Sequence, residues 1–260
     1  MGDLPERAFL AELARAAAAE TLPRFRAAGA VINKKGEGFD PVTEADRAAE
    51  GAIRALIEAR FPEHGIVGEE HGAVRADASH VWVIDPIDGT RAFISGLPVW
   101  GTLVGLTVNG VARCGFMHQP FTNELFLADG AGAALLQGER TPVQLRTRKG
   151  VALSDATLFT TTPALYTGEK RPRYEALEAR VRLPRYGCDC YAFAMVAAGH
   201  ADIAVEPGLA PHDICALVPL IEQAGGVVTR WDGGRPERGG DIIAAGSADL
   251  HASALDIVGH

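Results

Sequence analysis

Residues 82–90 read Trp-Val-Ile-Asp-Pro-Ile-Asp-Gly-Thr, an apolar run that ends in a pair of acids. The run Val81–Ile84 is typical of a buried strand, and Pro86 predicts that this strand ends there. A strand that runs into carboxylates at a turn holds Asp85 and Asp88 at the rim of a fold rather than in its core. Carboxylate oxygens are hard ligands that suit Mg²⁺ or Mn²⁺. No Cys or His stands in the run, which disfavours zinc.

The apolar surroundings of this acid pair are a second indication of a bound cation. Two carboxylates beside strongly apolar residues repel each other and lose hydration unless a cation compensates them. Asp46, Glu69 with Glu70, and Asp213 are further acidic candidates for the same site. Asp46 also has a structural explanation, as the acid of a capping box that begins at Thr43. Asp213 has one as well, because an acid in the first turn of a helix complements the helix dipole.

Composition limits the classes of partner. The chain has 260 residues and 47% hydrophobic content, enough for one large domain or two lobes. Its net charge of −8 argues against a nucleic-acid or anionic-membrane surface. No apolar run approaches the roughly 18–20 residues that cross a bilayer, and the start lacks a signal-peptide pattern. Four cysteines, with Cys188 and Cys190 too close for an ordinary disulfide, predict reduced thiols in a cytoplasmic protein, with a redox pair as the alternative.

The order of predicted elements indicates a layered α+β fold. Helices are predicted over 5–28 and from the N-cap Thr43 to a point before Pro62, and a strand is predicted at Ile66-Val67. An antiparallel meander follows over 99–137, with a hairpin turn at Asn109-Gly110. The second half mixes both kinds of element: strands at 157–161, 201–205 and 227–229, and helices at 172–181, 189–199 and 211–224. The polar stretch 138–152 predicts a boundary between an N-terminal lobe, 1–145, with the main metal motif, and a C-terminal lobe, 146–260, with substrate recognition and one metal ligand.

Several segments together resemble the inositol monophosphatase family of Mg²⁺-dependent phosphatases. The resemblance covers about residues 35–230 and implies an αβαβα sandwich of the inositol monophosphatase/fructose-1,6-bisphosphatase type. It also implies a homodimer and hydrolysis of a phosphate monoester by in-line attack of metal-activated water. The segments are Asp85-Pro86-Ile87-Asp88-Gly89-Thr90, Gly68-Glu69-Glu70, Val42-Thr43-Glu44-Ala45-Asp46, Glu206-Pro207-Gly208, His212-Asp213 and Glu222-Gln223-Ala224-Gly225-Gly226.

The same resemblance implies the metal ligands. Glu69, Asp85 and the backbone carbonyl of Ile87 would hold one Mg²⁺ ion, and Glu69 would also count as a catalytic residue. Asp85, Asp88 and Asp213 would hold a second ion, with Asp85 bridging the two. A third, weaker ion would rest on Glu69 and water, and Mn²⁺ is a substitute metal.

It further implies the residues around the attacking water and the phosphate. Asp46 and Thr90 would orient the water as a hydrogen-bonded pair. Asp88, Gly89 and Thr90 would bind the phosphate, the last two through backbone amides at a helix start. Lys35 would lie on a loop near the site.

One stretch resembles the histidinol-phosphate phosphatase subgroup more closely. Residues 185–193, Arg-Tyr-Gly-Cys-Asp-Cys-Tyr-Ala-Phe, are similar to its Arg-Tyr-Gly-Gly-Asp-Cys-Tyr-Ala-Tyr, with Cys188 in place of a Gly. Arg185, Asp189 and Glu206 would then face the substrate. Carboxylates at the last two positions would pair with the ammonium and imidazole groups of histidinol. The structural alternatives are that Asp189 caps a helix and that Glu206 is a turn acid.

These observations favour a histidinol-phosphate phosphatase of histidine biosynthesis. The alternatives are a broad inositol-1-monophosphatase and, less favoured because no adenine platform is evident, a 3′-phosphoadenosine 5′-phosphate phosphatase. A non-catalytic metal- or phosphate-binding module is the alternative from another class. The expected partner is a small phosphorylated molecule, not nucleic acid or membrane, and His212 is interpreted as a pocket-lining neighbour of Asp213.

Overall fold

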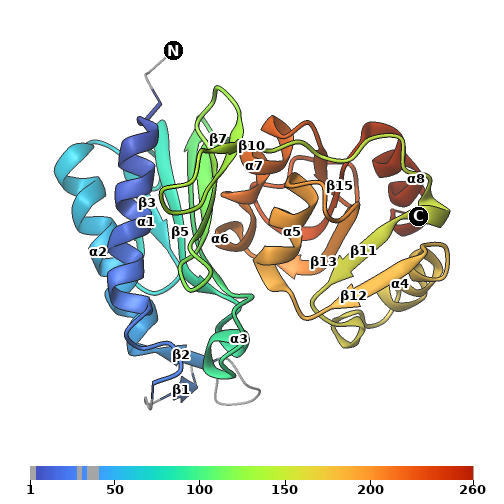
Figure 1. The fold of residues 1–260 in the computed structure, drawn as a ribbon, viewed down its shortest axis with the longest axis horizontal. Helices are drawn as coiled ribbons and strands as arrows, with labels where there is room; N and C mark the ends of the chain where they lie inside the picture. The colour runs from blue at the N-terminus through green and yellow to red at the C-terminus, as the bar shows by residue number, and fades with distance from the viewer. Residues whose placement is uncertain (1–3, 28–30, 34–40, 260) are drawn as a thin grey trace.

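Helices and two large sheets alternate in α, β, α, β, α layers (Figure 1). The protein is seen here as a computed structural model, which describes residues 4–27, 31–33 and 41–259. This arrangement confirms the αβαβα sandwich that the resemblance implied. One outer layer holds α1 (Arg7–Thr21) and α2 (Glu44–Arg60), and the other holds α4 (Lys170–Glu178) and α8 (Ala248–Val258). Between the sheets lie α5 (Asp189–Ala197), α6 (Pro211–Ile214) and α7 (Leu217–Gln223).

The first sheet is mostly antiparallel, as predicted. Its described strands follow the order β10-β9-β8-β7-β6-β5-β3-β4, and among them β3 and β5 are the parallel pair. Asn109 and Gly110 both have positive φ and close the predicted hairpin between β6 and β7. The strands are β3 (Gly65–Gly68), β4 (Gly72–Val74), β5 (His80–Asp88), β6 (Gly101–Val108), β7 (Val111–Gln119), β8 (Glu124–Ala128), β9 (Ala133–Leu136) and β10 (Val143–Gln144).

The second sheet comes from the C-terminal half of the chain. Its described strands have the order β12-β11-β13-β15-β14. They are β11 (Thr157–Thr160), β12 (Leu183–Tyr186), β13 (Ile203–Leu209), β14 (Val227–Arg230) and β15 (Gly240–Ala245). The smaller elements are the paired strands β1 (Val31–Asn33) and β2 (Pro41–Thr43), the short helix α3 (Thr90–Ile94), and the 3₁₀ turns Leu153–Asp155 and Pro163–Leu165.

Three sequence predictions about element ends were wrong. Strand β5 does not stop before Pro86 but continues to Asp88, because its pairing with β6 becomes irregular between Asp85 and Asp88 and no ladder bond is needed from the proline. Strand β13 likewise runs past residue 205 to Leu209 with a register shift. The helix predicted over 211–224 is broken into α6 and α7. The elements β12, β15 and α8 were not predicted.

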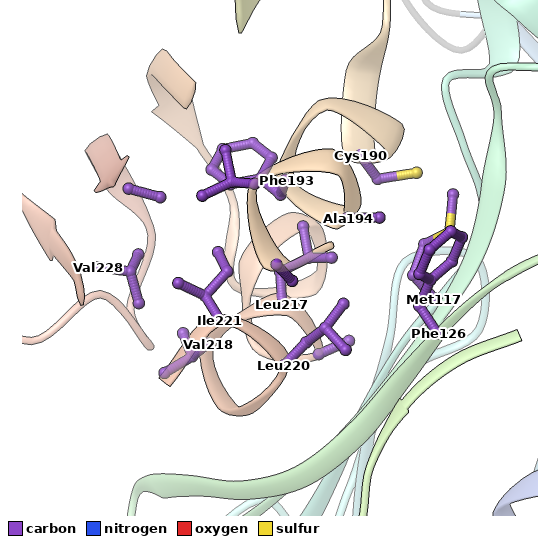
Figure 2. Packing of buried hydrophobic residues seen from close by; sticks show 14 of the residues in the cluster. Met117, Phe126, Cys190, Phe193, Ala194, Leu217, Val218, Leu220, Ile221 and Val228 are labelled. Carbon is purple, nitrogen blue, oxygen red and sulfur yellow. The ribbon is translucent and has the colours of Figure 1, made fainter. Parts of the chain in front are cut away.

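A buried cluster joins the two sheets through α5 and α7. Figure 2 shows Met117 and Phe126 of the first sheet on one side of these helices and Val228 of the second sheet on the other. Phe193 of α5 and Ile221 of α7 lie between them. Helices that are apolar around much of their circumference are stable only when they are covered on both sides. The division into lobes 1–145 and 146–260 stays a prediction.

Two paired glycines set how closely the middle helices approach the first sheet. Gly105 of β6 faces Gly115 of β7 in the ladder. A Cβ atom on Gly105 would lie 2.7 Å from the backbone carbon of Cys215, and one on Gly115 would lie 3.1 Å from Cα of Ala216. The break between α6 and α7 therefore rests directly on the sheet. This contact brings Asp213 over the end of β5.

Candidate active site

Acids from three separate elements meet at the end of β5. The parallel pairing of β3 with β5 brings Glu69, which follows β3, beside Asp85, and the Glu69 amide donates to the Ile84 carbonyl at 3.2 Å. Asp213 reaches the same place from α6. Carboxylate oxygens of Asp85, Asp88 and Asp213 all lie within 4.8 Å of one another. The structure thus brings together four of the acids that the sequence placed in one site, namely Glu69, Asp85, Asp88 and Asp213.

The electrostatics of this cluster fit a divalent cation. Burial raises the pKa of Asp85 well above its usual value, and the charges of Glu69, Asp88 and Asp213 raise it further. Burial, followed by the charges of Asp213 and Asp189, has the same effect on the pKa of Asp88. Asp85 is only 2% exposed. Buried carboxylates at this density need protons or a cation, and their hard oxygen donors match Mg²⁺ or Mn²⁺.

The irregular end of β5 is held by local hydrogen bonds. The Ile87 amide donates to Asp85 Oδ1 at 3.0 Å, and the Thr102 hydroxyl donates to the Pro86 carbonyl at 2.8 Å. The Cys190 amide, in the first turn of α5, donates to Asp88 Oδ2 at 2.7 Å. Both aspartates are therefore fixed in orientation before any ligand binds.

Glu50 of α2 holds the turn that carries Glu69, and the sequence reasoning missed it. Its fully buried carboxylate accepts from the amide of Glu70 at 2.7 Å, from the amide of His71 at 3.1 Å and from Arg54 Nε at 2.7 Å. The sequence pattern that could have indicated this role is the spacing of Glu50 and Arg54, an acid four residues before an arginine on a helix, next to its apolar positions.

Asp46 and Thr90, predicted to act as a hydrogen-bonded pair, are each hydrogen-bonded to another residue in the structure. Asp46 and Thr43 form the predicted capping box of α2, with the Thr43 amide donating to Asp46 Oδ2 at 2.8 Å. Burial raises the pKa of Asp46 to about 6, against the lowering effect of the Thr43 hydrogen bonds. The Thr90 hydroxyl donates to the Ile87 carbonyl at 3.1 Å. The predicted loop residue Lys35 lies outside the described residues.

Asp189 lies close enough to this cluster to affect the pKa of Asp88, and it shares Thr161 with Glu206. The Thr161 hydroxyl donates to Asp189 Oδ1 at 3.3 Å, and its amide donates to Glu206 Oε1. A Cβ atom on Gly89 would lie 3.0 Å from Asp189 Oδ2, so the Asp189 carboxylate borders the turn at Gly89 that was predicted to bind phosphate. Burial raises the pKa of Glu206 to about 7, with a smaller contribution from Asp189. Arg185 is exposed on the edge strand β12.

The backbone of Asp189 is strained, which does not fit a simple capping role. Its φ is +42°, a conformation that is uncommon for residues other than glycine. The first turn of α5 has no side-chain capping hydrogen bond from its N-cap, Cys188. Strain of this kind persists where surrounding contacts determine it, often at ligand sites.

The sequence profile of the inositol monophosphatase family matches residues 4–259. The chain belongs to this family. A chloroplastic bifunctional phosphatase of Arabidopsis thaliana, IMPL2, is 40% identical over 243 residues, covering 89% of this chain and 68% of the relative. A histidinol-phosphatase of Chlorobaculum parvum is 33% identical and covers 98% of this chain and 97% of its own. The solved structure of an inositol monophosphatase from Zymomonas mobilis has a TM-score of 0.85 at 37% identity, over 96% of each chain.

Membership of the inositol monophosphatase family makes the chain a metal-dependent phosphatase that hydrolyses small phosphorylated substrates. The relatives differ in the substrate that their names give, so the family alone leaves the substrate open. All four cysteines are free thiols. Within the described ranges, no helix combines the length and apolar character needed to cross a bilayer.

Proposed function

We propose that this chain is a Mg²⁺-dependent histidinol-phosphate phosphatase. In this proposal Glu69, Asp85 and the Ile87 carbonyl would hold one ion, and Asp85, Asp88 and Asp213 would hold another. A third, weaker ion would rest on Glu69 and water. Bound ions of this kind neutralise the phosphate dianion, lower the pKa of a bound water and stabilise the leaving alkoxide.

The chain's own residues orient the reactants. Asp46 is fixed by its Thr43 hydrogen bonds, and with a pKa of about 6 it is largely ionised at neutral pH and able to accept a proton from water. The Thr90 hydroxyl donates a hydrogen bond to the Ile87 carbonyl, which leaves its oxygen able to accept a hydrogen bond from the same water. The amides of Gly89 and Thr90 receive phosphate oxygens. Lys35 stays a proposed neighbour of the site.

The paired carboxylates of Asp189 and Glu206 carry the choice of substrate. Asp189 borders the turn at Gly89 that is proposed to bind phosphate, and Glu206 lies next to Asp189 across Thr161, where the alcohol side of a phosphate monoester would sit. Histidinol presents an ammonium group and an imidazole there, whereas inositol presents only hydroxyls. A cation would relieve the repulsion between the buried Glu206 and the half-buried Asp189, which polyol hydroxyls would do to a smaller extent. Arg185, at the outer edge, is the third proposed substrate contact.

Phosphate release from histidinol phosphate and inositol-1-phosphate tests the assignment. We expect a higher kcat/KM on histidinol phosphate. The decisive variant is Asp189→Asn, because asparagine tolerates positive φ and keeps the shape while removing the charge. Its kcat/KM on histidinol phosphate should fall about 10- to 150-fold, corresponding to about 1.5–3 kcal/mol for a charged hydrogen bond, with a much smaller change on inositol-1-phosphate.

The exposed Asp155, in a 3₁₀ turn, provides the matched control as Asp155→Asn. If the parent enzyme has a higher kcat/KM on inositol-1-phosphate, the histidinol-phosphate proposal is wrong. The chain would then be the alternative, a broad inositol-1-monophosphatase, a function that the names of some relatives and solved structures favour. We also propose a cytoplasmic homodimer, which light scattering and cell fractionation test.

A further inference from the structure

His212 adds a nitrogen donor to one side of the acid cluster. A ring nitrogen of His212 and carboxylate oxygens of Glu69 and Asp85 lie within 4.8 Å of one another. The oxygen-only group of Asp85, Asp88 and Asp213 lies beside it and shares Asp85. The two halves of the site therefore offer different ligand chemistry.

The position of His212 is set by the fold of α6. Pro211 begins this short helix, and the Ala210 amide donates to Asp213 Oδ2 at 2.7 Å, which fixes the turn. The break after α6 lies directly on Gly105 of β6 and Gly115 of β7, and α6 itself contacts β5 and β6. His212 is a neighbour of Asp213 in the chain, yet it joins the group on the Glu69 side. Its Nε2 atom is 3.4 Å from Asp213 Oδ1, and its side chain is 24% exposed.

We propose that His212 is a ligand of the ion held by Glu69 and Asp85, and that it makes this position selective for Mn²⁺ over Mg²⁺. Imidazole nitrogen binds first-row transition ions well and Mg²⁺ poorly, while carboxylates accept both. The position at Asp85, Asp88 and Asp213 keeps only oxygen ligands and has no such preference. This inference rests on the proposed metal site but not on the proposed substrate, and it makes Mn²⁺ rather than Mg²⁺ the preferred ion at this one position.

The metal alone is a sufficient probe. The full chain is stripped of metal, loaded with Mn²⁺ and examined by pulsed electron paramagnetic resonance, which detects ¹⁴N coupled to the ion. We expect imidazole ¹⁴N modulation in the parent protein and in the control His200→Ala, whose histidine is exposed after α5. The modulation should disappear in His212→Ala and in His212→Gln, the second of which keeps most of the side-chain volume.

Competition titrations with Mn²⁺ and Mg²⁺ measure the selectivity of this position for one ion over the other. In His212→Ala the Mn²⁺ affinity should fall about 10-fold or more, and the Mg²⁺ affinity should fall much less. Absence of ¹⁴N modulation in Mn²⁺-loaded parent protein, or an equal loss of affinity for both ions, would overturn the inference and leave His212 as a charge partner of Asp213. A parent protein that binds no Mn²⁺ would overturn the metal site itself. If the enzyme prefers inositol-1-phosphate and still shows nitrogen modulation, the proposed substrate is wrong but the assignment of His212 as a metal ligand is supported.

Discussion

Removal of the Glu50 carboxylate should lower the free energy of unfolding and also make the turn that carries Glu69 more mobile, because Glu50 accepts hydrogen bonds from that turn. The Glu50 side chain is 0% exposed and that of its partner Arg54 is 10% exposed, so their ion pair is screened from water. Breaking a buried pair by removing one member costs about 3–5 kcal/mol. Glu50→Ala also leaves the amides of Glu70 and His71 without their acceptor, at about 1–3 kcal/mol each if water does not replace it. Because water will enter part of the space, we expect a loss of about 4 kcal/mol.

Urea unfolding of the metal-free protein measures this loss. A change of about 4 kcal/mol is a large fraction of the 5–15 kcal/mol by which folded domains are usually stable. Glu50→Gln keeps a carbonyl acceptor for the amides but not the charge, so its loss should be smaller. Glu58→Ala, on the exposed part of the same helix, is the matched control and should change stability by less than about 0.5 kcal/mol. The reasoning fails if Glu50→Ala is as stable as Glu58→Ala.

Two further outcomes follow from the glycine contacts and from Glu206. Gly105→Ala should lower the free energy of unfolding by about 1–3 kcal/mol by overpacking and should weaken metal binding, because the new Cβ pushes the α6–α7 break and Asp213 away from β5. Calorimetric titration with Mg²⁺ checks the loss of binding. Gly51→Ala is the control, since a Cβ there enters open space on α2 and should stabilise the protein. Because folding raises the Glu206 pKa from 4.5 to about 7, its contribution to stability is full below pH 4.5 and is lost as the pH rises through 7, by about 3 kcal/mol. Unfolding of Glu206→Gln across this range should lack that decline, and identical pH profiles for the two proteins would contradict the assignment.

The fold was predictable where short-range patterns determine it. The hairpin at Asn109-Gly110 follows from the positive φ that a type I′ turn requires, and the capping box of Thr43 and Asp46 is a contact between residues three apart. The stretch around Asp85 and Asp88 was sufficient to indicate a cation, because apolar neighbours and paired charges are visible in the sequence.

The sequence by itself determined the family, the layered fold and the set of acids, since these depend on local motifs and periodicity. Only the tertiary structure decided that β5 passes through Pro86, that Glu50 supports Glu69, and that His212 joins Glu69 and Asp85. The first depends on the irregular hydrogen-bond pairing between β5 and β6, and the last depends on how closely the helices between the sheets pack against Gly105 and Gly115. Such contacts join residues far apart in the chain, and their geometry is set by packing between layers rather than by any local preference.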